Sequence, residues 1–235
     1  MNLVLILPED LLAPDHARLT GRRLRHVREV HRAAVGDDLT VGLLGGKMGR
    51  GRVLHLDDEA LELALALDQE PPPKLPLTLL IAVPRPKVLN RVVAAASSLG
   101  AARLVLVNAW KVEKAYWASP RMRPESLREQ LVLGLEQARD TVLPELRLAR
   151  LFRPFVEDEL PGLIGEGTGL LAHPGTGEAA PKTLVAPLTL AIGPEGGWIE
   201  AEVQSLLKAG LHPLDLGPRI LRTETALAAL VGRLF

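Results

Sequence analysis

Two loops rich in glycine and proline near the C-terminus constrain the fold of this chain more than any other feature. The first is Ile192-Gly193-Pro194-Glu195-Gly196-Gly197, and the second runs from Leu216 to Ala226. Each loop follows a short apolar run and precedes a helical pattern, so each is predicted to connect a strand to a helix. Strand-to-helix loops of this kind indicate an α/β domain with a ligand crevice at the carboxyl ends of its strands.

Three consecutive prolines, Pro71 to Pro73, mark a domain boundary, because they form a stiff extended spacer that continues neither a helix nor a paired strand. Residues 1–70 contain short β-like runs separated by turn signals, which favours a small barrel or sandwich. In residues 74–235 strand and helix patterns alternate, which predicts a mostly parallel sheet covered by helices on both faces. The segment 61–67 is ambiguous, since its Leu, Ala and Glu residues also favour a helix.

The periodicity predicts the main elements of both domains. A glycine-rich turn is expected over 45–52. The predicted strands are 2–7, 39–44, 51–56, 61–67, 77–83, 103–107, 146–151 and 169–172, and the predicted helices are 87–99, 124–139, 155–164, 199–209 and 225–234.

Composition excludes several classes of protein. The apolar fraction of 47% supports a substantial core, and the absence of cysteine excludes disulfides and thiolate metal sites. No apolar run is long enough for a membrane span, and the N-terminus lacks a secretory pattern. No cluster of His, Asp and Glu has the spacing of a metal site. We therefore expect a cytoplasmic protein without membrane or metal partners.

The formal net charge is zero, but basic residues concentrate between Arg18 and Arg52, where nine of them face only three acidic residues. A local basic patch on a neutral protein predicts an anionic partner, nucleic acid first. The alternative is the solvated face of an amphipathic helix over 18–32. The candidate RNA-binding residues are Arg18, Arg22, Arg23, Arg25, Arg28, Arg32, Lys47 and Arg50.

The first loop lacks the spacing of dinucleotide and nucleoside triphosphate sites, and no Gly-x-Ser-x-Gly elbow is present. A loop of backbone amides with one carboxylate, Glu195, suits a small neutral or cationic ligand such as an adenosyl group. The alternative role of Glu195 is to stabilise the N-terminus of the following helix.

The two loops together resemble the RsmE family. The motif that carries the resemblance is Leu190-Ala191-Ile192-Gly193-Pro194-Glu195-Gly196-Gly197 followed by Leu216-Gly217-Pro218-Arg219-Ile220-Leu221-Arg222-Thr223-Glu224-Thr225-Ala226. Weaker similarity lies at Val30 to Asp37 and at Glu136-Gln137 with Pro144. Members of that family are bacterial methyltransferases that act on N3 of a uridine in 16S ribosomal RNA.

The resemblance implies an N-terminal PUA-like RNA-binding barrel and a C-terminal SPOUT α/β domain with a trefoil knot. It also implies a homodimer that binds S-adenosylmethionine and acts on 16S rRNA or the small ribosomal subunit. For the chemistry that the resemblance implies, the catalytic candidates are Arg222, Glu195 and Glu224. Arg222 would be a cation that stabilises the uracil anion, and Glu195 and Glu224 would be bases. The structural alternative for Arg222 and Glu224 is an ion pair between them. The implied cofactor-binding residues are Leu171, His173, Ile192, Gly193, Pro194, Glu195, Gly196, Gly197, Leu216, Gly217, Ile220, Leu221 and Arg222.

Several positions depart from the family pattern. Ala95 and Ser98 replace a Lys and a Glu, Ala109-Trp110-Lys111 stands where Ser-Glu-Arg is usual, and Asp140 replaces an Arg that is shifted to Arg139. Two alternatives therefore stay open: a SPOUT enzyme that methylates another RNA position, such as a ribose 2′-oxygen or a tRNA base, and a non-catalytic RNA-binding assembly factor.

Overall fold

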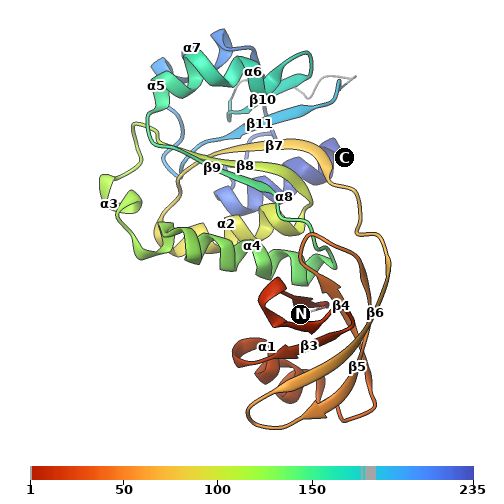
Figure 1. The fold of residues 1–235 in the computed structure, drawn as a ribbon. Helices are drawn as coiled ribbons and strands as arrows, with labels where there is room; N and C mark the ends of the chain where they lie inside the picture. The colour runs from red at the N-terminus through yellow and green to blue at the C-terminus, as the bar shows by residue number, and fades with distance from the viewer. Residues whose placement is uncertain (1, 176, 178–183) are drawn as a thin grey trace. The chain divides into compact units, whose positions relative to one another are not determined.

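The computed structural model describes residues 2–175, 177 and 184–235 (Figure 1). The chain divides into two compact units, residues 1–73 with 132–143, and residues 74–131 with 144–235. The first break follows the triple proline. The segment 132–143, which lies within the second predicted domain, belongs to the first unit because Val132 and Leu135 share a buried cluster with Leu3 and Leu5.

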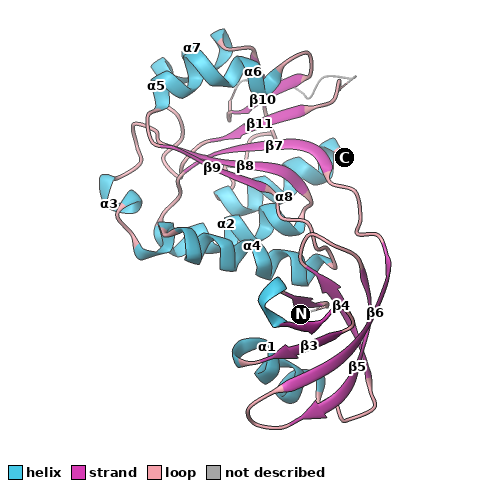
Figure 2. Cartoon of the chain, in the orientation of Figure 1, coloured by secondary structure: helices cyan, strands magenta, loops and turns pink. Residues whose placement is uncertain are grey.

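The first unit contains a curled six-stranded sheet, a half-barrel in strand order β1-β4-β5-β6-β3-β2 (Figure 2). Strands β1 and β4 pair in parallel, and the other pairs are antiparallel. The ambiguous segment 61–67 is a strand. The elements of this unit are β1(Val4–Ile6), η1(Pro8–Asp10), β2(Leu11–Ala13), β3(His16–Leu19), α1(Gly21–His26), η2(Val27–His31), β4(Asp38–Leu43), β5(Met48–Leu56) and β6(Leu61–Gln69).

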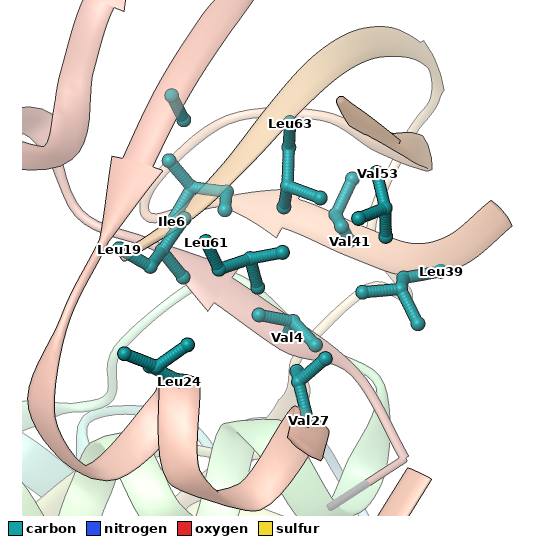
Figure 3. Packing of buried hydrophobic residues seen from close by; sticks show 11 residues of the cluster. Val4, Ile6, Leu19, Leu24, Val27, Leu39, Val41, Val53, Leu61 and Leu63 are labelled. Carbon is teal, nitrogen blue, oxygen red and sulfur yellow. The ribbon is translucent and has the colours of Figure 1, made fainter. Parts of the chain in front are cut away.

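Alternating side chains of these strands fill the core of the first unit. Leu19, Val53 and Leu63 each lie between more exposed neighbours and are almost fully buried. Leu24 and Val27 of the helical segment α1–η2 belong to the same cluster, as Figure 3 shows. Burial of these side chains stabilises the unit by about 1.5–3 kcal/mol each relative to exposure. The helical segment therefore packs its apolar side against the sheet and leaves Arg25, Arg28 and Arg32 exposed.

The glycine-rich turn expected over 45–52 is shorter than predicted, because β5 begins at Met48. A Cβ on Gly49 would lie 2.0 Å from the carbonyl oxygen of Ala66, and one on Gly51 would lie 2.7 Å from Val41. These glycines allow close approach between neighbouring elements and do not form a loop. Strands β2 and β3 were also missing from the prediction.

The second unit is built on a six-stranded sheet whose strands all run parallel, in the order β12-β10-β11-β7-β8-β9. This confirms the predicted α/β class. Figure 1 shows α5, α6 and α7 on one face of the sheet, and α2, α8 and the first part of α4 on the other. The elements are β7(Leu75–Ala82), α2(Pro86–Ser98), β8(Ala101–Val107), α3(Lys114–Trp117), η3(Pro120–Met122), α4(Pro124–Ala138), β9(Glu145–Ala149), α5(Phe152–Pro154), η4(Phe155–Glu159), α6(Leu160–Ile164), β10(Thr168–Ala172), β11(Leu188–Ile192), α7(Glu200–Lys208), β12(Leu211–Leu214) and α8(Thr223–Leu234).

The order of the strands reverses between β7 and β11. The chain runs outward from β7 through β8 to β9, and then crosses to the other side of β7 for β10, β11 and β12. In open parallel sheets, ligands bind outside the carboxyl ends of the strands at such a reversal. The trefoil knot stays a prediction. Within residues 2–175, 177 and 184–235, no helix combines the length and the apolar character needed to cross a membrane.

Candidate active site

A pocket opens where β10, β11 and β12 end at the same edge of the sheet. The loop that follows each strand supplies one wall, and residues of α8 supply the fourth. Most of the lining is apolar, which is typical of a site for a small organic ligand. The lining residues are Ala172, His173, Pro174, Ile192, Gly193, Pro194, Glu195, Gly197, Trp198, Leu214, Asp215, Leu216, Gly217, Arg219, Ile220, Leu221, Thr223, Ala226 and Leu230.

Two buried polar atoms of this lining lack a hydrogen-bond partner among the described residues, His173 Nδ1 and Trp198 Nε1. Leaving a buried polar group unpaired costs about 1–3 kcal/mol, so such groups mark positions that a ligand can satisfy. Gly193 lies against the indole, since a Cβ built there would be 3.1 Å from Trp198 Nε1. The pocket thus presents one indole N–H donor and one imidazole nitrogen to its occupant.

Asp215 joins two of the three loops. Its carboxylate accepts hydrogen bonds from the backbone N–H groups of Gly175 at 2.9 Å, Gly177 at 3.1 Å and Gly217 at 2.8 Å. These backbone donors, that of Gly217 first, lower the pKa of Asp215 from its ordinary value. The charged carboxylate therefore holds the loop after β10 against the loop after β12.

The loop after β11 is anchored on its other side. Lys111 Nζ donates to the carbonyl oxygen of Gly196 at 2.6 Å. The buried carboxylate of Glu202 accepts the backbone N–H groups of Ile199 at 3.0 Å and Trp110 at 2.7 Å. The loop that carries Glu195 and Trp198 is thus tied both to α7 and to the segment that follows β8.

The structure brings most of the predicted cofactor residues together. Three of them do not line the pocket: Leu171 is fully buried inside β10, Gly196 faces Lys111, and Arg222 is an exposed N-cap of α8. The predicted residues that line it are His173, Ile192, Gly193, Pro194, Glu195, Gly197, Leu216, Gly217, Ile220 and Leu221.

Glu195 and Glu224, the two candidate bases, have partners that the sequence did not indicate. Glu195 Oε1 accepts the backbone N–H of Arg85 at 3.0 Å, so it caps the start of α2 and not the helix that follows it. Glu202 occupies that capping role in α7. Glu224 pairs with Arg91, whose Nη2 lies 3.3 Å from its Oε1. Glu224 therefore pairs with α2, and not with Arg222 as in the structural alternative considered for these two residues.

Sequence reasoning missed Trp198 and Asp215. Each lies one position outside the quoted motifs, directly after Gly197 and directly before Leu216. An aromatic residue and a carboxylate adjoining glycine-rich loops are the signals that could have found them. The lining positions Thr223, Ala226 and Leu230 recur on one face of α8, with the spacing of successive helical turns.

The basic residues of the first unit lie on several different elements. Arg18 and Arg50 point outward from β3 and β5, because their strand neighbours are buried. Arg25, Arg28 and Arg32 are exposed on the segment α1–η2. The positive charge is thus divided between the outer face of the sheet and the helical segment.

Several of the basic side chains are engaged within the unit. Arg23 pairs with Asp10 and donates to the carbonyl oxygen of Leu5 at 2.8 Å, and its side chain is only 14% exposed. Arg22 Nη1 lies 2.9 Å from the buried Glu136 Oε2. Arg28 pairs with Asp58, and Lys47 Nζ lies 3.2 Å from Glu70 Oε1. Arg22 and Arg23 therefore serve the fold of the unit.

A parallel sheet with a largely apolar pocket at the carboxyl ends of its strands defines an α/β protein that binds a small organic ligand. Residues 70–234 match the family model described as the RNA methyltransferase domain. The chain is 32% identical over 239 residues to the ribosomal RNA small subunit methyltransferase E of Treponema pallidum, an alignment that covers 97% of this chain and 88% of that protein. The chain belongs to the RsmE family, as its loop motifs indicated, and is a methyltransferase of ribosomal RNA.

Two solved structures share the fold over the whole chain. The ribosomal RNA small subunit methyltransferase E of Neisseria gonorrhoeae, solved bound to S-adenosylmethionine, has a TM-score of 0.79 at 22% identity and covers 100% of this chain and 96% of its own. A methyltransferase of Legionella pneumophila, solved with the same bound cofactor, has a TM-score of 0.76 at 24% identity and covers 100% and 97%.

Proposed function

We propose that this protein transfers the methyl group of S-adenosylmethionine to N3 of one uridine in the 16S RNA of the small ribosomal subunit. The pocket at the ends of β10, β11 and β12 is the proposed site of the methyl donor. The observation that carries this assignment is the pair of unpartnered polar atoms, His173 Nδ1 and Trp198 Nε1, in an otherwise apolar lining.

The residues of the pocket fit an adenosyl group. Ile192, Leu216 and Ile220 offer apolar surface for a purine ring, and Gly217 leaves open space beside the backbone. The indole N–H of Trp198 would donate to a ring nitrogen or a ribose oxygen. When bound, S-adenosylmethionine supplies a methyl group already activated by its sulfonium. The protein must then hold this group in line with the attacking nitrogen.

The second task is to remove the proton from uridine N3, because the nitrogen attacks only as its lone pair becomes available. We assign Glu195 as the base that receives this proton on Oε2, the oxygen that leaves the bond from Arg85 intact. With the proton on Glu195, the N3–methyl bond would form as the methyl–sulfur bond of the donor breaks. Arg222 has no carboxylate partner among the described residues, and it would stabilise the negative uracil oxygens.

Glu224 stays in the proposal as a positioning residue. Its ion pair with Arg91 joins the first turn of α8 to α2, and α8 begins directly after Arg222. Ala95, Ser98, Trp110 and Asp140, at which the chain departs from the family pattern, are not among the residues that line the pocket. They therefore leave the proposed donor site complete.

The proposal includes a homodimer in the cytoplasm. Support for the dimer comes from Ile220, whose side chain is 85% exposed beside the pocket, and from Leu221 next to it. A second copy would cover this apolar rim and complete the site. Light scattering of Ile220→Glu should give half the mass of the parent protein; an unchanged mass would remove this part of the proposal.

Nucleoside mass spectrometry tests the reaction. Small ribosomal subunits from a strain that lacks the modification are incubated with the protein and S-adenosylmethionine, and the 16S RNA is digested. The appearance of 3-methyluridine supports the proposal. Another methylated nucleoside would mean a different RNA position, and no methylation with retained RNA binding would mean an assembly factor.

The role of the first unit is tested by salt-dependent RNA binding. Charge reversal at Arg25 and Arg32 probes the helical segment, and reversal at Arg18 and Arg50 probes the outer face of the sheet. Each lost phosphate contact should reduce the slope of log affinity against log salt by about 0.7–0.9. The pair that changes the slope identifies the RNA-facing surface, and unchanged slopes for both would contradict RNA binding by this unit.

A further inference from the structure

A second cavity lies on the other side of the strand reversal, where β8 and β9 end. It is open to solvent, has a volume of about 600 Å³, and is lined by aromatic, apolar and cationic side chains. We call it the tryptophan cavity, because it contains Trp110 and Trp117. Its lining residues are Asn108, Ala109, Trp110, Val112, Lys114, Trp117, Arg150, Phe152, Arg153, Ile199 and Glu202.

Trp110 is held rigidly by its backbone while its side chain remains free. The residue is 79% exposed, the largest aromatic surface among the exposed hydrophobic residues that the structure describes. Its backbone N–H donates to the buried carboxylate of Glu202 at 2.7 Å. The backbone of Trp110 is fixed and its indole is exposed to water. Binding of a flat apolar partner over the indole would remove apolar surface from water and lower the free energy of the bound state.

The second tryptophan is oriented by its ring nitrogen. Trp117 Nε1 donates to Asn108 Oδ1 at 2.9 Å, and the guanidinium of Arg150 lies over its ring, 5.4 Å from the centroid. The indole ring of Trp117 and the guanidinium of Arg150 therefore lie at the same wall of the cavity. Stacked aromatic and guanidinium planes recur in proteins that bind unpaired bases.

The charge of the cavity favours an anionic occupant. Among the described residues, Lys114 and Arg150 have no carboxylate partner, and Lys111 Nζ is bonded only to a backbone carbonyl. The carboxylate of Glu202 is already satisfied by two backbone N–H groups. Arg153 is paired with Glu157 outside the cavity. The remaining charge is positive.

The tryptophan cavity and the cofactor pocket share a wall. Phe152 of the cavity packs against Trp198 of the pocket, with 5.9 Å between ring centroids. Ile199, which directly follows Trp198, also lines the cavity. Lys111, which directly follows Trp110, donates to the carbonyl oxygen of Gly196 in the loop after β11. A group bound in the cavity therefore lies beside the loop that carries Glu195.

We propose that the tryptophan cavity binds one unpaired base of the substrate RNA that neighbours the target uridine. The base stacks on Trp110, and the adjoining phosphates contact Lys114 and Arg150. This inference rests on the proposed function and adds a subsite to it. Stacking tolerates any base, so the cavity selects single-stranded RNA and does not read its sequence.

The test compares Trp110→Ala with Trp110→Phe and with the matched control Leu151→Ala, which removes an exposed side chain outside the cavity. The probe is a short single-stranded oligouridylate, with a fully paired hairpin for comparison. Loss of one base stack should weaken binding of the single strand about 5- to 150-fold. Trp110→Phe and Leu151→Ala should stay close to the parent protein. The oligonucleotide should quench tryptophan fluorescence in the parent but not in Trp110→Ala.

Two further measurements separate the alternatives. Calorimetry should give unchanged affinity for S-adenosylmethionine in Trp110→Ala, since that residue does not line the pocket. Light scattering should give an unchanged mass. Unchanged RNA affinity, or a change in mass that makes Trp110 a contact between copies, would overturn the inference. Trp110-dependent RNA binding without uridine methylation would overturn the proposed reaction and leave the cavity assignment standing.

Discussion

Asp215 Oδ2 accepts a hydrogen bond from the backbone N–H of Gly175 at 2.9 Å, across a separation of 40 residues in the sequence. The same carboxylate binds the N–H of Gly217. Two walls of the cofactor pocket are thus fixed by one side chain. A hydrogen bond to a charged group is stronger than one to a neutral group, so the loss of these bonds should be measurable in cofactor binding.

Asp215→Asn should weaken the binding of S-adenosylmethionine by about tenfold, because an amide replaces one acceptor oxygen by a donor that faces backbone N–H groups. Calorimetry measures the change. Asp158→Asn is the matched control, since Asp158 is exposed in η4 and does not line the pocket. Equal affinity in both variants would contradict the clamp.

The affinity for S-adenosylmethionine should fall at acidic pH. The pKa of Asp215 is lowered by backbone N–H donors, so the clamp is fully present above the ordinary carboxyl value of 3.8 and is lost as the pH falls through the lowered pKa. Cofactor binding in the parent protein should therefore weaken at acidic pH through this group. In Asp215→Asn, the part of the acid-induced loss of cofactor affinity that is due to this carboxylate should be absent. If the variant loses affinity at acidic pH just as the parent does, another group is responsible.

Gly193→Ala should lower cofactor affinity by about tenfold, because the added methyl group would lie 3.1 Å from Trp198 Nε1 and push the indole from its place. Gly162→Ala is the control, since nothing lies within 4 Å of its Cβ and alanine favours the helix α6. Thermal melting should show a small gain for Gly162→Ala. Cofactor affinity equal to that of the parent in Gly193→Ala would contradict the close approach.

Glu195→Gln should reduce the rate of methyl transfer by about 10²–10⁴-fold, the usual contribution of a general base. Gln keeps an oxygen to accept the N–H of Arg85, so cofactor binding should be nearly unchanged. Single-turnover rates across pH provide the measurement. If Glu195 only caps α2, the pH profile of the variant will keep the shape of the parent profile.

Arg22→Ala should lower the free energy of unfolding by about 1–3 kcal/mol, because it removes a partner of a carboxylate that is almost completely buried, Glu136. The half-exposed Arg22 side chain reduces the effect below that of a fully buried pair. Arg25→Ala is exposed and should stay within about 0.5 kcal/mol of the parent. Urea unfolding followed by circular dichroism distinguishes the two, and equal stability would contradict the role of the pair.

The sequence predicts the strands and loops of this fold where a single hydrophobic or glycine-rich pattern covers the segment. The apolar runs before Gly193 and Gly217 end in loops as predicted, although the last strand ends at Leu214 and not at Leu216. Strand β6 was ambiguous because its Leu and Ala residues suit a helix, and pairing on both sides decides for a strand. Tertiary contact overrides propensity there.

Partners distant in sequence could not be predicted in the same way. Nothing near Glu195 indicates Arg85, and nothing near Glu224 indicates Arg91. The first pair forms because the loops after β7 and β11, two neighbouring parallel strands, end at the same edge of the sheet. The second forms because α8 packs against α2. The motifs therefore located the pocket, whereas the charges that hold it together depend on the packing of α2 against α8.

The helix α4 begins in the second unit, and its last residues belong to the first. A fragment that ends at Pro73 would lack Val132 and Leu135, and the side chains of Leu3 and Leu5 would lose their cover. Residues 1–73 alone are consequently not a complete, transferable domain. Grafting the N-terminal unit onto another enzyme would require both stretches of chain, so gene fusions cut at the triple proline should yield insoluble or partly folded products.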